Sequence, residues 1–491
     1  MPHYTYKNQD ITIDILMKIE HVVRILAEKH GKSFDEMLPQ FYASKTFAAL
    51  KNTESCMWAE SAEFIADDFE REKMRLIDDV VKNLRNNPVF LMSLASKELF
   101  HSNMLAWLLE SRGDDENNQP SEIAQALAKL FMPDYTVLTV LRERGHFDLL
   151  VVLLPAKDYN DTIKSNLTSI ADFFQNLGQL PEVQEDLLKS CKFAVVENKF
   201  KSIPNKNQLE KYKKKAKIKF SKKIKMDDGN TTYYLLAPLV SLDNFEQCDG
   251  WERISWDKIL DVLSKTKEKR DPFTATFMKY YADFLDNMLK LTKNIEEKLT
   301  STDKPAFPDW QDISKLKKIR IHDFYVKLWF SVLLNKIKEQ ISTEKLTLSE
   351  IGYTNTWGLL DFRVENKNIK NDDHVSYGIQ IQQGQFRLLV VPASTKETKY
   401  QWKDDSCPVE EIKLYFGDVL RIMNSEREKE KDNEFTLVEP KTKEGLCSYG
   451  DFKYKYIKLE NKSIAELTAM INNAVNAIYN SDKKTMKAEE K

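Results

Sequence analysis

The chain has 491 residues, of which 42% are hydrophobic and 31% charged, so we expect about three domains of roughly 150 residues each. The formal net charge of −2 excludes a global basic excess, and a nucleic-acid partner would need a local basic patch. The five cysteines are scattered without a CxxC pair, which argues against a zinc site and favours a reducing cytoplasm. No apolar run approaches the roughly 18 residues that cross a bilayer, so we expect no membrane partner.

The first 72 residues form a predicted helical module. Apolar side chains recur at helical spacing over residues 13–26, which predicts an amphipathic helix that ends at Gly31. Ser33 and Glu36 have the spacing of a capping box, so a second helix should begin there. We expect a module for packing or for docking a protein partner.

Residues 73–300 change character and predict an α/β core. A helical stretch over 74–109 should be interrupted at Asn87 and Pro88. Residues 157–190 are predicted to be inserted helices, and 203–219 a basic helix. Four apolar segments have strand character, namely Thr136–Leu141, Phe147–Leu154, Phe193–Val196 and Thr232–Pro238.

A polar linker with two prolines, residues 301–312, separates this region from the rest of the chain. Residues 313–491 predict an α+β domain of unknown role, which is also open to a protein partner. Its expected elements are a helix at Phe324–Glu339, strands at Gly358–Val364, Ser376–Gln382 and Phe386–Val391, a charged loop at Glu426–Glu434 and a helix at Ser463–Tyr479.

The tripeptide Glu-Asn-Lys occurs three times, beginning at Glu197, Glu365 and Glu460. Only the first copy follows a run that is apolar on both faces, Phe193–Val196, which predicts a strand in the middle of a sheet. Because side chains alternate along a strand, Glu197 and Lys199 should share one face while Asn198 points to the other. The two later copies follow alternating, half-exposed strands and predict polar turns.

A second carboxylate, Asp148, begins the apolar run of the preceding predicted strand. If the two strands are neighbours in the sheet, Asp148 and Glu197 converge at one edge. Buried charges are costly unless compensated, and two carboxylates with backbone oxygens and waters suit Mg²⁺, with Mn²⁺ as the alternative. Such a metal acidifies a bound water and stabilises charge on a phosphate, while Lys199 orients the water or neutralises the phosphate.

The segment that follows is rich in lysine, with twelve lysines against one acid from 199 to 225. This local basic patch suits a phosphate backbone; the alternative is a solvated helix face. Gln208 and Tyr212 are four residues apart and share a helix face, so they are candidates for holding the nucleophile or a phosphate oxygen. The lysines expected beside them on one stripe are Lys211, Lys214, Lys215 and Lys219.

Taken in order, these features resemble the PD-(D/E)XK nuclease superfamily, and a bacterial branch of it in particular. The motifs that carry the resemblance are the helix Lys97–Leu109, the strand start Arg144–Leu150, Val196–Lys199 followed by Gln208–Tyr212, the strand Tyr233–Pro238 and a helix start at Trp251. The resemblance covers about 75–300 and implies a restriction-endonuclease-like core, a central mixed sheet flanked by helices. Phe147 stands where the superfamily usually has proline, and the interval from Asp148 to Glu197 is long.

Carried over to this chain, the resemblance makes Asp148 and Glu197 metal ligands and catalytic residues, and Lys199 the catalytic lysine. Glu98 becomes an additional acidic catalytic residue that reaches the metal directly or through water. His101 shares the helix face of Glu98 and either contacts a substrate phosphate or packs the helix against its neighbours.

These features together predict a Mg²⁺-dependent nuclease that hydrolyses phosphodiester bonds of nucleic acid, with DNA favoured as partner. With extra modules at both ends and no motor motif, the chain resembles bacterial anti-phage defence effectors that act in the cytoplasm. A homodimer is an expected state, because double-strand cutting by a single site often needs two copies. The alternative is a non-catalytic nucleic-acid-binding or partner-scaffolding protein on a nuclease-like fold.

Overall fold

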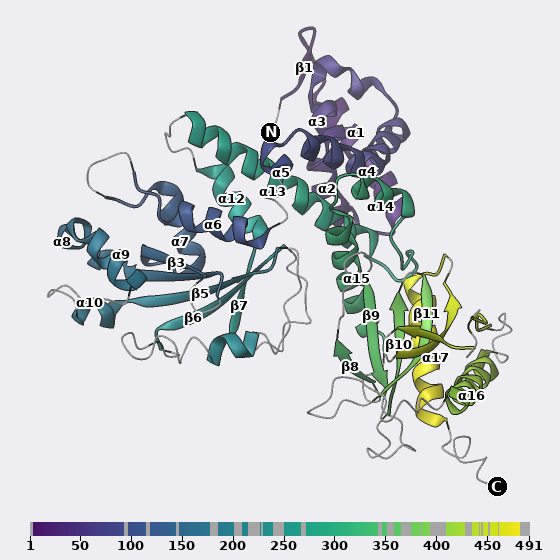
Figure 1. The fold of residues 1–491 in the computed structure, drawn as a ribbon. Coiled ribbons are helices and arrows are strands. Elements are labelled where there is room, and N and C mark those ends of the chain that lie inside the picture. Colours follow the sequence, from purple (N-terminus) through teal and green to yellow (C-terminus); the bar gives the residue numbers. More distant parts are fainter. Residues whose placement is uncertain are drawn as a thin grey trace. The chain divides into compact units, whose positions relative to one another are not determined.

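Figure 1 shows the chain as a computed structural model. The structure describes residues 3–481 apart from 93–96, 114–117, 144–146, 177–184, 201–208, 215–225, 227–228, 239–249, 267–271, 342–345, 351–357, 365–374, 383, 393–408, 428–434, 441, 443–444, 450–451 and 460. The chain forms two compact units, Met1–Asn83 and Leu84–Lys491. In the described part of the chain, no helix combines the length and the apolar character needed to cross a bilayer.

The N-terminal unit is helical, as predicted. Its elements are β1 (Thr5–Tyr6), β2 (Gln9–Asp10), α1 (Thr12–His30), α2 (Phe34–Tyr42), α3 (Lys45–Lys51), the short 3₁₀ turns η1 (Thr53–Ser55) and η2 (Met57–Ala59), and α4 (Ala62–Arg85). Gly31 ends α1 in the left-handed region at φ 60°, which glycine adopts without steric cost. Ser33 and Glu36 form the predicted capping box at the start of α2. Both predictions are confirmed.

A five-stranded mixed sheet lies in the second unit, in the order β3-β4-β5-β6-β7 (Figure 1). Its strands are β3 (Tyr135–Arg142), β4 (Leu149–Pro155), β5 (Lys192–Asn198), β6 (Thr231–Ala237) and β7 (Trp251–Ser255). β3, β4 and β5 pair antiparallel, whereas β5, β6 and β7 pair parallel. All four predicted strands are confirmed. β5, whose sequence is apolar on both faces, is the middle strand, as expected for a strand covered on both sides.

Helices flank this sheet and complete the predicted restriction-endonuclease-like α/β architecture. They are α5 (Pro88–Leu91), α6 (Glu98–Leu109), α7 (Glu122–Phe131), α8 (Asp161–Ser165), α9 (Leu167–Asn176), α10 (Glu185–Ser190), α12 (Trp256–Lys265) and α13 (Pro272–Lys298), with the 3₁₀ turn η5 (Ala156–Asp158). The predicted break at Pro88 is confirmed, since α4 ends at Arg85 and Asn87 caps α5. The predicted helix start at Trp251 is wrong. Trp251 instead begins β7, which pairs with β6, and α12 begins at Trp256.

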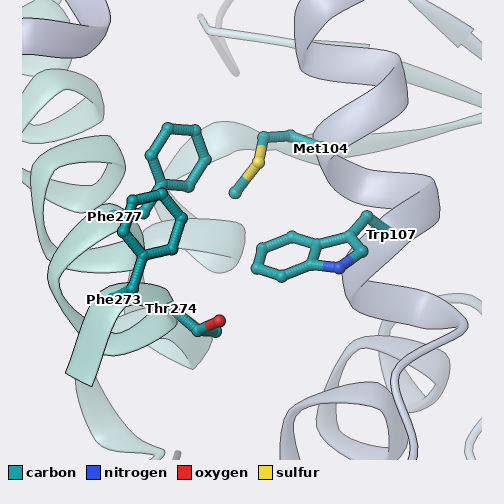
Figure 2. Close-up of a pocket in the computed structure, with 5 residues that line it drawn as sticks. All are labelled: Met104, Trp107, Phe273, Thr274 and Phe277. Atoms are coloured by element: carbon teal, nitrogen blue, oxygen red, sulfur yellow. The ribbon is translucent and has the colours of Figure 1, made fainter. Parts of the chain in front are cut away.

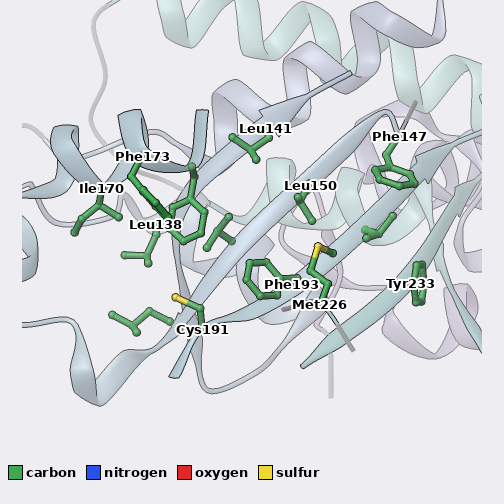
Figure 3. Packing of buried hydrophobic residues seen from close by; sticks show 14 of the residues in the cluster. Leu138, Leu141, Phe147, Leu150, Ile170, Phe173, Cys191, Phe193, Met226 and Tyr233 are labelled. Carbon is green, nitrogen blue, oxygen red and sulfur yellow. The ribbon is translucent and has the colours of Figure 1, made fainter. Parts of the chain in front are cut away.

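The helices of the predicted insertion pack onto one face of the sheet (Figure 3). Ile170 and Phe173 of α9 join one buried cluster with Leu150 of β4 and Phe193 of β5. The insertion therefore covers the sheet without separating β4 from β5, which are direct neighbours.

The C-terminal part of the second unit holds a separate antiparallel sheet in the order β12-β13-β11-β10-β9-β8. Its strands are β8 (Leu346–Glu350), β9 (Leu359–Val364), β10 (Val375–Gln382), β11 (Gln385–Pro392), β12 (Cys447–Tyr449) and β13 (Phe452–Lys458), and its helices are α14 (Trp310–Lys317), α15 (His322–Lys338), α16 (Val409–Arg427) and α17 (Ile464–Asn480). The three predicted strands and two predicted helices are confirmed, and the half-exposed strand predicted before Glu460 overlaps β13. The elements β8, β12, α14 and α16 were not predicted. Of the predicted charged loop, Glu426 belongs to α16 and residues 428–434 lie outside the described residues. Within the predicted linker, Ala306 is buried and its N–H donates to the Lys462 carbonyl at 2.8 Å. The domain boundaries at 72, 300 and 312 stay predictions.

Candidate active site

β4 and β5 bring the two predicted carboxylates to one edge of the mixed sheet. Leu149 of β4 pairs with Val196 of β5 in antiparallel register, so Asp148 and Glu197 occupy the next opposed positions. The Asn198 backbone N–H donates to Asp148 Oδ2 at 2.6 Å, which holds the Asp148 side chain beside the end of β5. The prediction that the two strands are neighbours is confirmed.

Glu197 and Lys199 form a buried ion pair at the end of β5. Lys199 Nζ lies 2.7 Å from Glu197 Oε1, and only 2% of Glu197 and 8% of Lys199 is exposed. The Lys199 backbone N–H donates to the Leu236 carbonyl of β6 at 2.9 Å, so the sheet still fixes the chain at this position. Glu197 Oε2 is fully buried and accepts no hydrogen bond from the described residues. That oxygen is therefore available to a cation.

Burial and crowding of negative charge disfavour the ionised carboxylates at this edge. Burial, followed by the charge of Asp148, raises the pKa of Glu197 to about 7 even though Lys199 opposes the rise. Burial also raises the pKa of Asp148, although the Asn198 N–H and Lys199 act in the opposite direction. The Glu98 carboxylate adds to the pKa of both. Carboxylates perturbed by burial and by neighbouring acids are typical of catalytic and metal sites.

Lys199 keeps its proton in this setting. Burial alone would lower the pKa of the Lys199 ammonium, but the Glu197 carboxylate and its hydrogen bond outweigh burial, so that the pKa is raised. At neutral pH, Lys199 is a cation that donates hydrogen bonds and accepts none. Its chemistry is that of an electrostatic or orienting group and not that of a general base.

Asn198 connects β5 to the first turn of α6. Its side chain lies on the opposite face from Glu197, as predicted, and its Nδ2 donates to the Glu98 carbonyl and to Ser102 Oγ, both at 3.2 Å. These bonds hold the start of α6, and with it the Glu98 carboxylate, near the paired acids. The sequence prediction assigned Asn198 no role. The sequence does contain a sign of this role, because Asn198 is a polar residue on the same strand face as the apolar Ala194 and Val196.

His101 lies in a buried aromatic cluster. Its ring is 0% exposed, stacks on Phe200 with the centroids 4.1 Å apart, and places Nδ1 3.1 Å from the Tyr281 hydroxyl. Trp256 meets the ring edge-on at 5.5 Å. Because a phosphate has no access to this ring, the geometry favours helix packing over the predicted contact with substrate. Phe200 directly follows Lys199 and belongs to the same cluster, which anchors the chain after the lysine. The sequence prediction gave Phe200 no role.

Residues 209–214 are the described, helical part of the predicted basic helix. Lys211 and Lys214 are exposed, whereas Tyr212 is half-buried and packs edge-on against Phe147 with ring centroids 6.1 Å apart. The structure thus brings Tyr212 to the side chain that precedes Asp148. The predicted site residues Gln208 and Lys215, and the further stripe residue Lys219, lie outside the described residues.

The later Glu-Asn-Lys copies have a different setting. Residues 365–367 and Glu460 lie outside the described residues. Asn461 has φ 48°, in the left-handed region that asparagine tolerates in turns, and Lys462 pairs with Glu466 at 3.1 Å on the following helix. Asn461 and Lys462 of the third copy therefore have the geometry of the predicted polar turn.

A pocket of about 350 Å³ lies between α6 and α13 (Figure 2). It is lined by Met104, Trp107, Phe273, Thr274 and Phe277. The lining has no titratable group and includes none of the predicted site residues. This pocket suits an apolar group. Its lining residues include no acid, base or cation that could take part in phosphodiester hydrolysis.

Part of the chain that includes this site matches a family model. Residues 188–283 match the family model of the PD-(D/E)XK nuclease superfamily. The match includes β5 with Glu197 and Lys199, and it confirms the resemblance predicted from the sequence for this segment. Asp148 and Glu98 lie N-terminal to the matched residues. No curated protein and no solved structure matches the chain.

Nucleases of this superfamily generally use a divalent metal, and the donor set of the site fits one. Asp148 and Glu197 supply hard oxygen donors, Glu197 Oε2 is a buried acceptor without a partner among the described residues, and the Asp148 charge makes ionisation of Glu197 more costly. Among the described residues, no group of three or more His, Cys, Asp or Glu side chains is arranged to hold a metal. A bound Mg²⁺ would therefore need backbone oxygens and waters to complete its shell.

The pKa of Glu197 predicts how stability depends on pH in the metal-free protein. The pKa rises from 4.5 to about 7 on folding, so the folded protein binds this proton more tightly than the unfolded chain. The free energy of unfolding therefore falls as pH rises through that window. In EDTA at pH 8, Glu197→Gln should be more stable than the wild type by roughly 1–3 kcal/mol, with no gain at pH 4. Thermal and urea unfolding at the two pH values measure the difference.

Glu252→Gln is the matched control, because Glu252 is an exposed carboxylate of β7 in the same sheet. It should leave stability unchanged at both pH values. A Glu197→Gln variant that is less stable than the wild type at pH 8 would show that the ion pair with Lys199 outweighs the burial and repulsion of the Glu197 charge.

Proposed function

We propose that this chain is a metal-dependent nuclease that hydrolyses phosphodiester bonds of nucleic acid. The observation that carries the proposal is the buried Glu197–Lys199 pair beside Asp148. Here a carboxylate oxygen lacks a partner, burial and like charge raise the pKa of Glu197 to about 7, and an ammonium lies 2.7 Å away. A purely structural ion pair does not require a second carboxylate beside it, and the charge of Asp148 is offset only in part by Lys199 and the Asn198 N–H. The superfamily match over residues 188–283 supports the same conclusion.

In this proposal Asp148 and Glu197 hold Mg²⁺, or Mn²⁺ in its place, and Glu98 reaches the ion through a bound water. The metal supplies Lewis acidity toward the phosphate and a more acidic bound water. The protein supplies the position of its ligands. The Asn198 N–H orients Asp148, and the Asn198 side chain fixes the turn that carries Glu98.

Lys199 is proposed as the catalytic lysine. Since its pKa is raised by Glu197, it acts as a fixed cation that donates hydrogen bonds to the attacking water or to a phosphate oxygen. A preorganised cation in a site shielded from water stabilises charge that develops in the transition state. The protein does not have to reorganise during the reaction to supply this field.

The nucleic acid is proposed to approach along the helix that includes residues 209–214. Lys211 and Lys214 are exposed there and suit backbone phosphates. Tyr212, with Gln208 before it and Lys215 after it, is proposed to contact the substrate next to the metal. DNA is the substrate we favour.

A second candidate function is a non-catalytic nucleic-acid-binding or scaffolding protein on the same fold. One observation favours it, since no third metal-ligating side chain joins Asp148 and Glu197 among the described residues. In that case the acids would be a remnant, and their loss would leave every activity intact.

Cleavage assays separate the two functions. With Mg²⁺ or Mn²⁺, the wild type should cut duplex DNA, single-stranded DNA or RNA, and EDTA should stop it. Lys199→Ala and Asp148→Asn should each slow cleavage by about 10²-fold or more, because each removes a charge aimed at the reacting phosphate. Product formation on labelled substrates under single-turnover conditions measures the rate.

Lys462→Ala serves as the matched control, since Lys462 belongs to another Glu-Asn-Lys copy and forms a partly exposed ion pair with Glu466. Its cleavage rate should equal that of the wild type. Equal rates for wild type, Lys199→Ala and Asp148→Asn would end the nuclease proposal and leave the binding function.

We further propose that the protein acts in the bacterial cytoplasm as a defence effector against phage. The arrangement of a nuclease-like core with modules on both sides supports this role by analogy alone. Bacteria that express the wild type should give fewer plaques than bacteria that express Lys199→Ala for at least one phage of a broad panel. Equal plaque counts across the panel would remove the proposed role.

A further inference from the structure

The two faces of the C-terminal sheet carry different side chains, and the printed ring contact with helix α16 lies on only one of them. Tyr377 of β10 packs on Tyr415 of α16 with ring centroids 4.4 Å apart, which identifies the helix-covered face. Arg387 is opposite Gln380 of β10 and Tyr456 of β13, at positions that alternate with the helix-covered ones. We call this second surface the Arg387 face. Its members on β9–β13 include Asp361, Arg363, Gln380, Gln382, Gln385, Arg387, Tyr449, Phe452, Tyr454 and Tyr456.

Arg387 is held in a fixed orientation by neutral groups. Its Nε donates to Gln385 Oε1 at 2.8 Å, and its Nη1 donates to Gln380 Oε1 at 2.8 Å and Gln382 Oε1 at 2.6 Å. The guanidinium also lies over the Tyr454 ring, 4.6 Å from its centroid. Three amide oxygens and an aromatic ring therefore orient the cation without neutralising it.

The Arg387 charge is buried without a counter-ion. Arg387 is 8% exposed, and no carboxylate of the described residues lies within ion-pair distance of it. Burial lowers the pKa of its guanidinium, and the groups that oppose this are two tyrosines and Cys447. A buried charge of this kind is costly unless an opposite charge joins it. Its Nη2, which is not fully buried, makes no hydrogen bond with the described residues, so an anion can add one.

Arg363 gives a direct comparison on the same face. Its Nη1 lies 2.8 Å from Asp361 Oδ1, and its guanidinium lies 5.9 Å from the Phe452 ring centroid. The chain thus neutralises one arginine of this face with its own carboxylate and leaves the other for a ligand.

Aromatic side chains surround the unneutralised arginine. Phe452, Tyr454 and Tyr456 follow one another at every second position of β13 and are half-buried. Tyr449 of β12, which pairs with Phe452 in the sheet, is 75% exposed. Aromatic rings on an antiparallel sheet provide surfaces on which unpaired bases stack with little dependence on sequence.

We propose that the Arg387 face binds a single strand of nucleic acid, with a backbone phosphate against Arg387 and bases stacked on the neighbouring tyrosines. Phosphate is the anion that matches a guanidinium fork, and the rings alongside match the bases that flank it. A duplex keeps its bases stacked on one another and offers these rings no base face. The proposal gives the C-terminal domain a substrate-recognition role and adds to the proposed nuclease function, but the binding itself does not depend on cleavage.

The test is the affinity of the full chain for a short labelled single strand, measured by fluorescence anisotropy in EDTA and in the Lys199→Ala background. Arg387→Gln should weaken binding by about tenfold and lower the log–log salt dependence by about one unit. Tyr449→Ala should weaken binding by about fivefold through lost stacking. Because Tyr449 is exposed, this variant tests the face even if Arg387→Gln perturbs folding, which its melting temperature reports.

Lys453→Gln is the matched control, because it removes a positive charge from the same strand at a position that belongs to the opposite face. Its affinity should stay within about twofold of the wild type. Unchanged affinity in both Arg387→Gln and Tyr449→Ala would overturn the proposal. Equal sensitivity of duplex binding to these variants, or equally tight binding of a mononucleotide, would also overturn it. Since no cleavage is measured, a failure here is distinct from a failure of the nuclease proposal.

Discussion

The antiparallel pairing of β4 with β5 is the constraint on which the candidate site depends. It sets Asp148 at the start of one buried strand opposite Glu197 at the end of the other. The two strands are held on both sides by β3 and β6 and are apolar on both faces, so their register cannot slip without moving the whole core. A rigid scaffold of this kind can hold two acids together in spite of their repulsion.

The site therefore destabilises the folded protein. Burial and repulsion raise the pKa of Glu197 to about 7, and Lys199 and the Asn198 N–H offset only part of the cost. Sites that break local rules of stability in this way are commonly functional. The same logic applies to Arg387, whose buried charge is oriented by three glutamines and is not neutralised by any described residue. In both places the charge that the described residues leave uncompensated is the basis of the proposed ligand, a metal cation beside Glu197 and a phosphate beside Arg387.

The sequence predicted the parts of the structure that local patterns determine. The apolar run before Glu197 predicted a central strand, and Ser33 with Glu36 predicted a helix start, because each signal lies within a few residues of its effect. It failed where the partner is distant. Trp251–Ser255 is a strand because it pairs with β6, and no pattern within five residues contains that information. His101 packs on Phe200 and on Tyr281, which is 180 positions further along the chain. The side chains that contact Arg387 come from three strands, β10, β11 and β13.

The central claim is that Asp148 and Glu197 form a metal site in which Glu197 is partly protonated before metal binds. Calorimetric titration with Mg²⁺ or Mn²⁺ at pH 7, in two buffers of different ionisation enthalpy, measures the protons released on binding. With a pKa of about 7, the wild type should release about half a proton per metal from Glu197 at pH 7 and close to none at pH 9. Glu197→Gln should bind the metal more weakly and lose this release. Metal binding without proton release at pH 7, or with the same release in Glu197→Gln, would contradict the account.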